Sequence, residues 1–209
     1  MNTKREKISK EQLREFFLGL LRVNLRMPED DGTVSRECEM FPELEEYLVA
    51  VDENMDGTSY LMSRVRHEHL NALGIAEDEA WAAAAEKTSG SIQIDEIRSV
   101  MNELAADIFG VQIFPKEELG DPFSLYVLTN DIRFAGAGAI LYSRELLKDV
   151  SKDIGINRWI AYPASSHEWI LEPDIGAGKL EDRVSIMQEA DSENGQDNRL
   201  IDKVYYLTV

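Results

Sequence analysis

The sequence predicts an α+β fold, in which a mixed, largely antiparallel sheet is flanked by helices. Runs rich in β-branched and aromatic residues favour strands, and they gather in the carboxy-terminal half at residues 125–129, 158–162, 168–172 and 204–209. Runs with helical spacing of apolar residues lie before and between them, at residues 9–25, 94–109, 145–154 and 179–189. The first helix and a hairpin over residues 46–66 are expected to form a second layer or small lobe.

The first helix, residues 9–25, has the clearest start signal in the chain. Ser9 can cap it, and Gln12 at the third helical position would complete a capping box. Pro28 is expected to end it. One apolar stripe should face the core, made of Leu13, Phe16, Phe17, Leu20 and Leu21.

The connection inside the hairpin resembles half of a calcium-binding loop. Asp52, Asn54 and Asp56 followed by a glycine fit its first six positions. The twelfth position should be a bidentate glutamate, and here it is Ser63. A hairpin turn between two strands is therefore the preferred interpretation, with calcium as the alternative.

Two histidines follow the hairpin. His67 and His69 could share one face of a strand and bind a metal, but no third ligand is suitably spaced. An exposed pair at a strand end is the expected arrangement.

Residues 76–87 predict a helix whose acidic first turn suits the helix dipole, with Trp81 as its contact to the core. After the strand at 125–129, Asn130 and Asp131 should form a turn that could contribute to binding. Residues 135–143 predict a strand, in which Gly136 and Gly138 would allow another backbone or a ligand to come close.

The densest group of reactive side chains contains Ser165, His167 and Glu168. On a strand, His167 and Glu168 would point to opposite faces and could not form a catalytic pair directly. The structural interpretation has His167 donating to a backbone carbonyl and the serine hydroxyls capping the turn after Pro163.

Composition limits the partners. The 209 residues carry a formal net charge of −18, which disfavours nucleic acids and anionic membranes. A solvated acidic surface is the simpler interpretation, and a basic protein partner is the alternative. The single cysteine, Cys38, favours a cytoplasmic protein. Glu37 and Glu39 should raise the pKa of its thiol.

Four segments, read in order, resemble a bacterial domain family of unknown function, family 5688. They are LYVLTN, GAGAILY, YPASSHEWIL and VYY, and the upstream ALGIAEDEAWAAAAEKTS is also similar to the family pattern. The resemblance covers residues 60–209 and implies a divergent amino-terminal part (1–58) before an α+β domain (59–209), unless both form one continuous domain. Ala164 and Ser166 depart from the family pattern, which usually has Ser and Ile there.

Two functions are consistent with these features. The first is a non-catalytic binding module that uses its acidic surface, and a groove beside Asn130 and His167, to bind a protein. The second is a small hydrolase or metal-assisted enzyme built on His167 and Glu168. No cofactor is expected for either.

Overall fold

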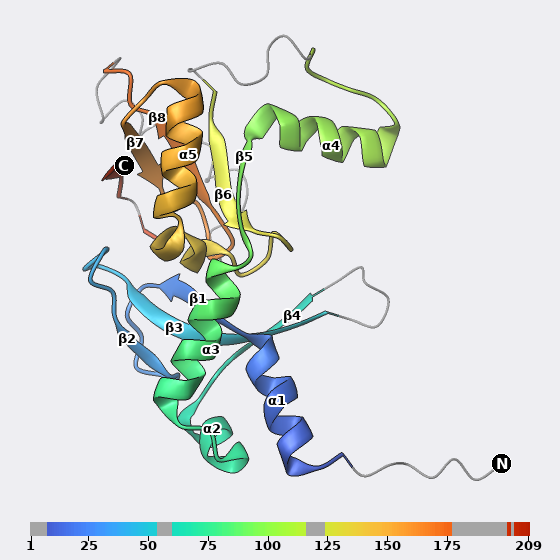
Figure 1. Ribbon diagram of the computed structural model, residues 1–209, viewed down its shortest axis with the longest axis vertical. Helices are drawn as coiled ribbons and strands as arrows, with labels where there is room; N and C mark the ends of the chain where they lie inside the picture. Colours follow the sequence, from blue (N-terminus) through green and yellow to red (C-terminus); the bar gives the residue numbers. More distant parts are fainter. Residues whose placement is uncertain (1–7, 54–59, 116–123, 177–199, 202) are drawn as a thin grey trace, which may run out of the picture.

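The computed structural model describes residues 8–53, 60–115, 124–176, 200–201 and 203–209. Two antiparallel sheets lie end to end with helices packed beside them, so the α+β class is confirmed (Figure 1). All strand pairs in the described residues are antiparallel, without the mixed pairing that the sequence suggested.

The first sheet is organised around β3 (Glu45–Glu53). Strand β1 (Leu21–Arg26) pairs with one edge of β3. The other edge is shared by β2 (Ser35–Glu37) and β4 (Tyr60–Arg64), which pair with successive parts of it. The predicted hairpin strands are therefore present, and their turn at residues 54–59 lies outside the described residues.

One face of this sheet is covered by α1 (Lys10–Leu20), α2 (His67–Leu73) and α3 (Glu77–Ser89). Trp81 of α3 is buried there, as predicted. The core between them contains Leu21, Val23, Val34, Leu48, Val65, Leu70, Ile75, Ala80 and Ala84.

The predicted helix over residues 9–25 is correct at its start and wrong at its end. Ser9 and Gln12 form the capping box, but the helix stops at Leu20 and the chain continues as β1. All six β1 residues are buried and pair in register with β3, from Leu21 with Ala50 to Arg26 with Glu45. Pairing with a distant strand outweighs the local helical spacing.

The second sheet has the order β5-β6-β8-β7-β9. Its strands are β5 (Ile92–Glu96), β6 (Tyr126–Asn130), β7 (Arg158–Tyr162), β8 (Trp169–Pro173) and β9 (Tyr205–Thr208). Helix α5 (Arg144–Ile154) confirms the helix predicted at residues 145–154; it ends at a left-handed Gly155 and packs Leu147 into the core.

Two expectations in this half are wrong, and one lies outside the described residues. Residues 92–96 form β5, so the helix predicted from residue 94 is α4 (Ile97–Phe109). The strand predicted at 135–143 is instead a 3-10 helix, η2 (Ala137–Tyr142). The helix predicted at 179–189 lies outside the described residues.

The glycines before and within η2 explain its position between the two sheets. A Cβ on Gly138 would overlap the carbonyl oxygen of Val23 in β1, and one on Gly136 would overlap the Thr129 hydroxyl and the His167 carbonyl. The expected close approach is thus made by the protein's own backbone.

The segment after β2 joins the two halves of the molecule. Phe41 and Leu44 enter the core of the second sheet, where the Phe41 ring stacks on Trp169 with centroids 4.7 Å apart. The predicted division after residue 58 falls in the connection between the paired strands β3 and β4, and it stays a prediction. No helix in the described ranges has the length and apolar character to span a membrane.

We predict that Gly138→Ala lowers the free energy of unfolding by about 3 kcal/mol, because η2 must move away from β1 to admit a methyl group. Gly19→Ala in α1 is the matched control, since a Cβ there meets nothing within 4 Å. It should leave stability unchanged or raise it by up to about 1 kcal/mol. Urea unfolding of both variants measures the difference, and equal stabilities would contradict the tight contact.

Candidate functional site

The turn before β8 holds the cluster that the sequence singled out. The Ser165 hydroxyl accepts a hydrogen bond from the His167 backbone N–H at 3.0 Å, so the serine caps the turn as expected. Strand β8 begins only at Trp169, so the prediction that His167 and Glu168 lie on a strand is wrong. The backbone N–H of Ser165 closes the turn by donating to the Glu168 carbonyl at 3.2 Å.

The imidazole of His167 accepts a hydrogen bond where a donated one was expected. Its Nδ1 accepts from the backbone N–H of Ala135 at 3.0 Å, which places the ring hydrogen of the neutral form on Nε2. The ring also stacks on Phe134, with centroids 4.8 Å apart. Burial lowers its pKa, and the charge of Glu168 opposes this in part. The neutral ring therefore has no free lone pair for taking a proton from a substrate.

The backbone carbonyls of this turn bind both sheets. The Ser166 carbonyl accepts from the Asn24 side chain of β1 at 3.1 Å and from the backbone of Ala137 at 3.3 Å. The His167 carbonyl accepts from the Thr129 hydroxyl of β6 at 2.7 Å and from the backbone of Gly136 at 3.1 Å. A catalytic role for Ser165, His167 or Glu168 stays a prediction, and the observed contacts are structural.

The predicted binding residues Asn130, Asp131 and Gly136 have separate surroundings and do not form one site. The Asn130 side chain is buried and closes the next turn, donating to the Phe134 carbonyl at 2.8 Å and accepting from its N–H at 3.2 Å. Gly136 lies against the His167 carbonyl. Asp131 is exposed and lines a separate pocket of about 510 Å³ beside the ends of α1 and α3. Binding by these three residues stays a prediction.

The weaker metal candidates are separated in the same way. Asp52 lies in β3, and Asn54 and Asp56 lie outside the described residues. His67 and His69 are exposed, but they begin α2 and do not end a strand, so they project in different directions. Within the part of the chain that is described, no three His, Cys, Asp or Glu side chains converge as a metal site.

Cys38 is buried in the core of the second sheet. The pKa of its thiol is raised as predicted, but burial is the first cause and the charge of Glu46 a smaller one, so the adjacent glutamates are not the reason.

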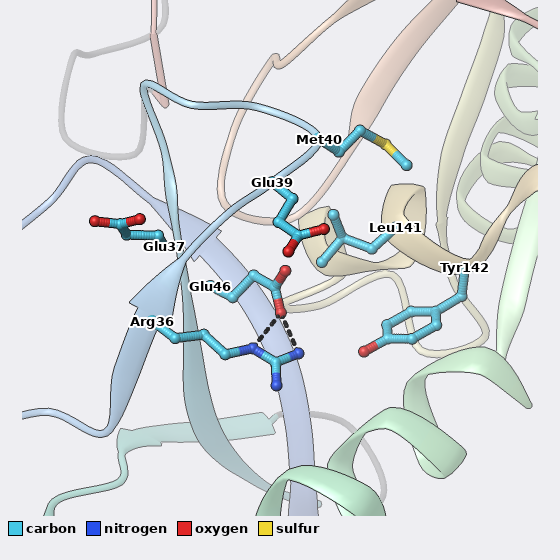
Figure 2. Close-up of a pocket in the computed structure, with 7 residues that line it drawn as sticks. All are labelled: Arg36, Glu37, Glu39, Met40, Glu46, Leu141 and Tyr142. Carbon is cyan, nitrogen blue, oxygen red and sulfur yellow. Dashed lines mark hydrogen bonds and ion pairs between the residues drawn. The ribbon is translucent and has the colours of Figure 1, made fainter.

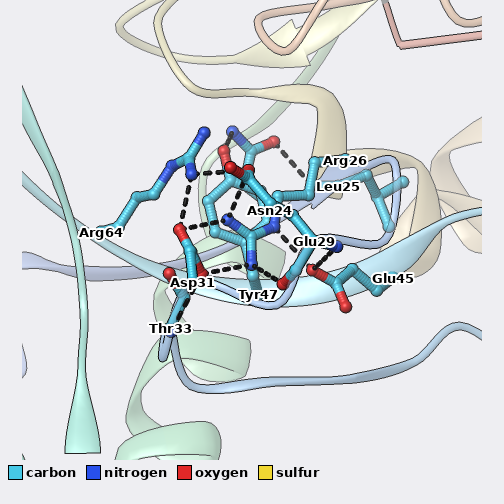
Figure 3. A network of polar contacts seen from close by, with 9 residues as sticks. All are labelled: Asn24, Leu25, Arg26, Glu29, Asp31, Thr33, Glu45, Tyr47 and Arg64. Atoms are coloured by element: carbon cyan, nitrogen blue, oxygen red, sulfur yellow. Dashed lines mark hydrogen bonds and ion pairs between the residues drawn. The ribbon is translucent and has the colours of Figure 1, made fainter.

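Sequence reasoning missed a buried ionic network on β1 (Figure 3). Arg22, Asn24 and Arg26 alternate along one face of the strand and are all buried. Arg26 Nε donates to Glu45 at 2.6 Å, and its Nη2 donates to Asp31 at 3.0 Å. The sequence signal for this strand was the alternation of apolar and polar residues in LRVNLR. It was overlooked because the helical spacing of the residues before it extends into the same segment.

Asp31 is the anion that several donors share. The pKa of its carboxyl is held far below its ordinary value by the hydrogen bond from Arg26, then by Thr33 and Arg64. Arg64 reaches it from β4 at 2.6 Å. These contacts fasten the connection between β1 and β2 to the sheet.

An acidic pocket lies beside β2, with a volume of about 720 Å³ (Figure 2). The residues that line it are Arg36, Glu37, Glu39, Met40, Glu46, Leu141 and Tyr142. They come from β2 and the segment after it, from β3, and from the end of η2. Three carboxylates, one guanidinium and an apolar wall thus line the pocket, and of the three carboxylates Glu46 contacts the guanidinium.

The guanidinium is held in place by its neighbours. Arg36 Nε and Nη2 donate to Glu46 at 2.9 and 2.6 Å, and the group lies 4.1 Å over the Trp81 ring of α3. Figure 2 shows the Tyr142 hydroxyl turned toward this pair. Burial, and then the charge of Glu46, raise the pKa of Tyr142, so its hydroxyl keeps its proton.

Glu37 and Glu39 both lack a cation partner among the described residues, but Figure 2 shows the Glu37 carboxylate directed away from the other lining side chains, which leaves Glu39 to interact with a ligand. Glu46, in contrast, is neutralised by Arg36. Figure 2 shows the Glu39 side chain beside Leu141. A second pocket of about 640 Å³ shares Arg36, Glu37 and Glu39 and extends toward Pro28 and Pro42. The surface around β2 is therefore hollowed and acidic.

Comparison with known proteins gives one match. The family described as a family of unknown function, DUF5688, matches residues 46–208. No curated protein and no solved structure matches the chain.

We predict that Arg26→Met lowers the free energy of unfolding by about 3 kcal/mol, because Asp31 and Glu45 would lose their partner in a mostly buried site. Arg64→Met is the matched control in the same network. Its side chain is 45% exposed, so the loss should stay within about 1 kcal/mol. Guanidinium unfolding of both variants tests this, and equal losses would show that burial does not set the strength of the network.

We also predict that His167 makes folding sensitive to acid. Because burial lowers its pKa from the ordinary value of 6.5, the unfolded chain binds the proton more readily than the native one. The stability that the neutral His167 ring contributes to the native state is complete above pH 6.5, and it is lost as the pH falls through the lower native pKa. His167→Gln, which keeps an acceptor, should lose less stability than the wild type between pH 7.5 and 5. His67→Gln, at an exposed position, should lose as much stability as the wild type over this range. If the free energy of unfolding of His167→Gln falls with pH as steeply as that of His67→Gln, His167 is not the source of the acid sensitivity.

Proposed function

We propose that this chain, which belongs to DUF5688, a family of unknown function, is a non-catalytic module that binds a basic segment of a partner protein. The observation that carries the proposal is the acidic pocket beside β2, with Glu39 available and an apolar wall next to it. A cytoplasmic location, inferred from the single cysteine, is part of the proposal.

The chemistry of the pocket suits a lysine or arginine side chain. Such side chains have an apolar stem and a charged end, and they lay the stem on apolar surface while the end meets a carboxylate. Leu141 and Met40 offer the apolar surface, and Glu39 offers the carboxylate. The Tyr142 hydroxyl is a further polar partner at the same wall.

Charge at longer range supports the same class of partner. A net charge of −18 attracts a basic segment from a distance and speeds its encounter with the pocket. The attraction should weaken as salt is added, because the Debye length falls to about 8 Å at physiological ionic strength.

The alternative, a hydrolase or metal-assisted enzyme built on His167 and Glu168, stays a prediction. What favours binding over it is the use of His167 Nδ1 as an acceptor for the Ala135 N–H, and of the Ser165 hydroxyl as the cap of its own turn. A nucleophile requires a base within reach that can take its proton.

Calorimetric titration tests the proposal with a short Gly-Ser peptide carrying two lysines, and with the same peptide after acetylation of both. We expect the lysine peptide to bind and the acetylated one to bind at least about tenfold more weakly. Glu39→Gln should weaken binding of the lysine peptide by about tenfold, while Glu68→Gln on helix α2, which does not line the pocket, should have no effect.

Two outcomes would overturn the proposal. One is equal affinity for the lysine and acetyl-lysine peptides. The other is turnover of model ester or phosphate substrates that His167→Gln abolishes, which would favour the enzyme.

A further inference from the structure

Helix α4 exposes an apolar stripe that the rest of the described structure does not cover. Met101, Leu104, Ile108 and Phe109 are 41–74% exposed, and only Asn102 and Ala105 of this helix are buried. The spacing of three, four and one places the first three on a single face of the helix. In Figure 1, α4 follows directly on β5 of the second sheet and extends away from that sheet.

The segment that follows α4 enlarges this surface, and Asn102 holds it in place. The Asn102 side chain accepts from the backbone N–H groups of Ile113 and Phe114, both at 2.8 Å, and donates to the Phe114 carbonyl at 2.9 Å. Val111 and Ile113, which are about half exposed, are thereby fixed next to the end of the helix. The patch is built from six large apolar side chains, and the hydrogen bonds to Asn102 hold the backbone at Ile113.

Charge at the edge of the stripe is negative. Glu103 and Asp107 lie four residues apart on one flank and are exposed. Arg133 reaches Glu103 at 3.1 Å, but it is shared with Asp95 at 3.4 Å. Arg98, the basic residue of α4, forms an ion pair with Glu96, the residue just before the helix.

We propose that the α4 stripe, together with Val111 and Ile113, is a docking surface for an amphipathic helix of a partner protein whose apolar stripe is flanked by lysine or arginine. Exposed apolar surface of this extent marks an interaction site. A helix that packs along α4 buries the stripe, and its basic flank meets Glu103 and Asp107.

A second copy of the chain fits this surface less well. Two α4 helices packed face to face would bring their acidic flanks together, and each chain carries a net charge of −18. The surface shares no residue with the acidic pocket beside β2, so it stands independently of the proposed function.

Fluorescence anisotropy tests this with two synthetic helices of about 20 residues, long enough to be helical. Both carry the same leucine stripe, one flanked by lysines and the other by glutamates. We expect the lysine-flanked helix to bind the full chain at least about tenfold more tightly than the glutamate-flanked one. Leu104→Ser combined with Ile108→Ser should weaken that binding by about tenfold or more.

Leu61→Ser, at an exposed apolar position on β4, is the matched control and should leave binding unchanged. Circular dichroism checks that all variants remain folded. Equal binding of the two helices, or equal losses in the stripe and control variants, would overturn the proposal. So would sedimentation showing a wild-type dimer that the Leu104→Ser and Ile108→Ser changes dissociate, since the occupant would then be a second copy.

Discussion

The side chain of Asn24 is the contact on which the arrangement of the two sheets depends. It is fully buried in β1, and its amide has four partners. Its oxygen accepts from the N–H groups of Leu25 at 2.9 Å and Gly138 at 3.2 Å. Its nitrogen donates to the Tyr47 hydroxyl at 3.3 Å and to the Ser166 carbonyl at 3.1 Å. One amide thus joins β1 and β3 to η2 and to the turn before β8, and an apolar side chain there would leave several buried polar groups unsatisfied.

The turn that contains His167 accepts the contact from Asn24 on the side of the second sheet. Polar side chains close together in sequence can suggest a reactive site, yet here their hydrogen-bonding groups are directed at the protein itself. The carbonyls of Ser166 and His167 accept from β1, β6 and η2, and the imidazole accepts from Ala135. Polar groups shielded from water must be paired, and this requirement accounts for the hydrogen bonds of the cluster, while a catalytic role for it stays a prediction.

The two proposed surfaces share an acidic character and differ in what holds them. The pocket beside β2 depends on tertiary contacts, since Arg36 is fixed by Glu46 of β3 and by the Trp81 ring of α3. The stripe on α4 depends on a local contact, the hydrogen bonds that the backbone N–H groups of Ile113 and Phe114 donate to the Asn102 side chain. The proposal that both surfaces bind basic partners rests on the excess of carboxylates along the chain.

Local signals were sufficient where the neighbours in sequence decide the structure. The capping box at Ser9, the helical spacing over residues 145–154, and the runs of β-branched and aromatic residues in β7 and β9 predicted their elements correctly. The sequence by itself thereby determined the α+β class, the family resemblance and the acidic surface. Only the tertiary structure decided that residues 21–26 form a strand, that residues 137–142 form a 3-10 helix, and where the ring of His167 points. The reason is that hydrogen bonds to residues distant in sequence set these features, and no local pattern reports them.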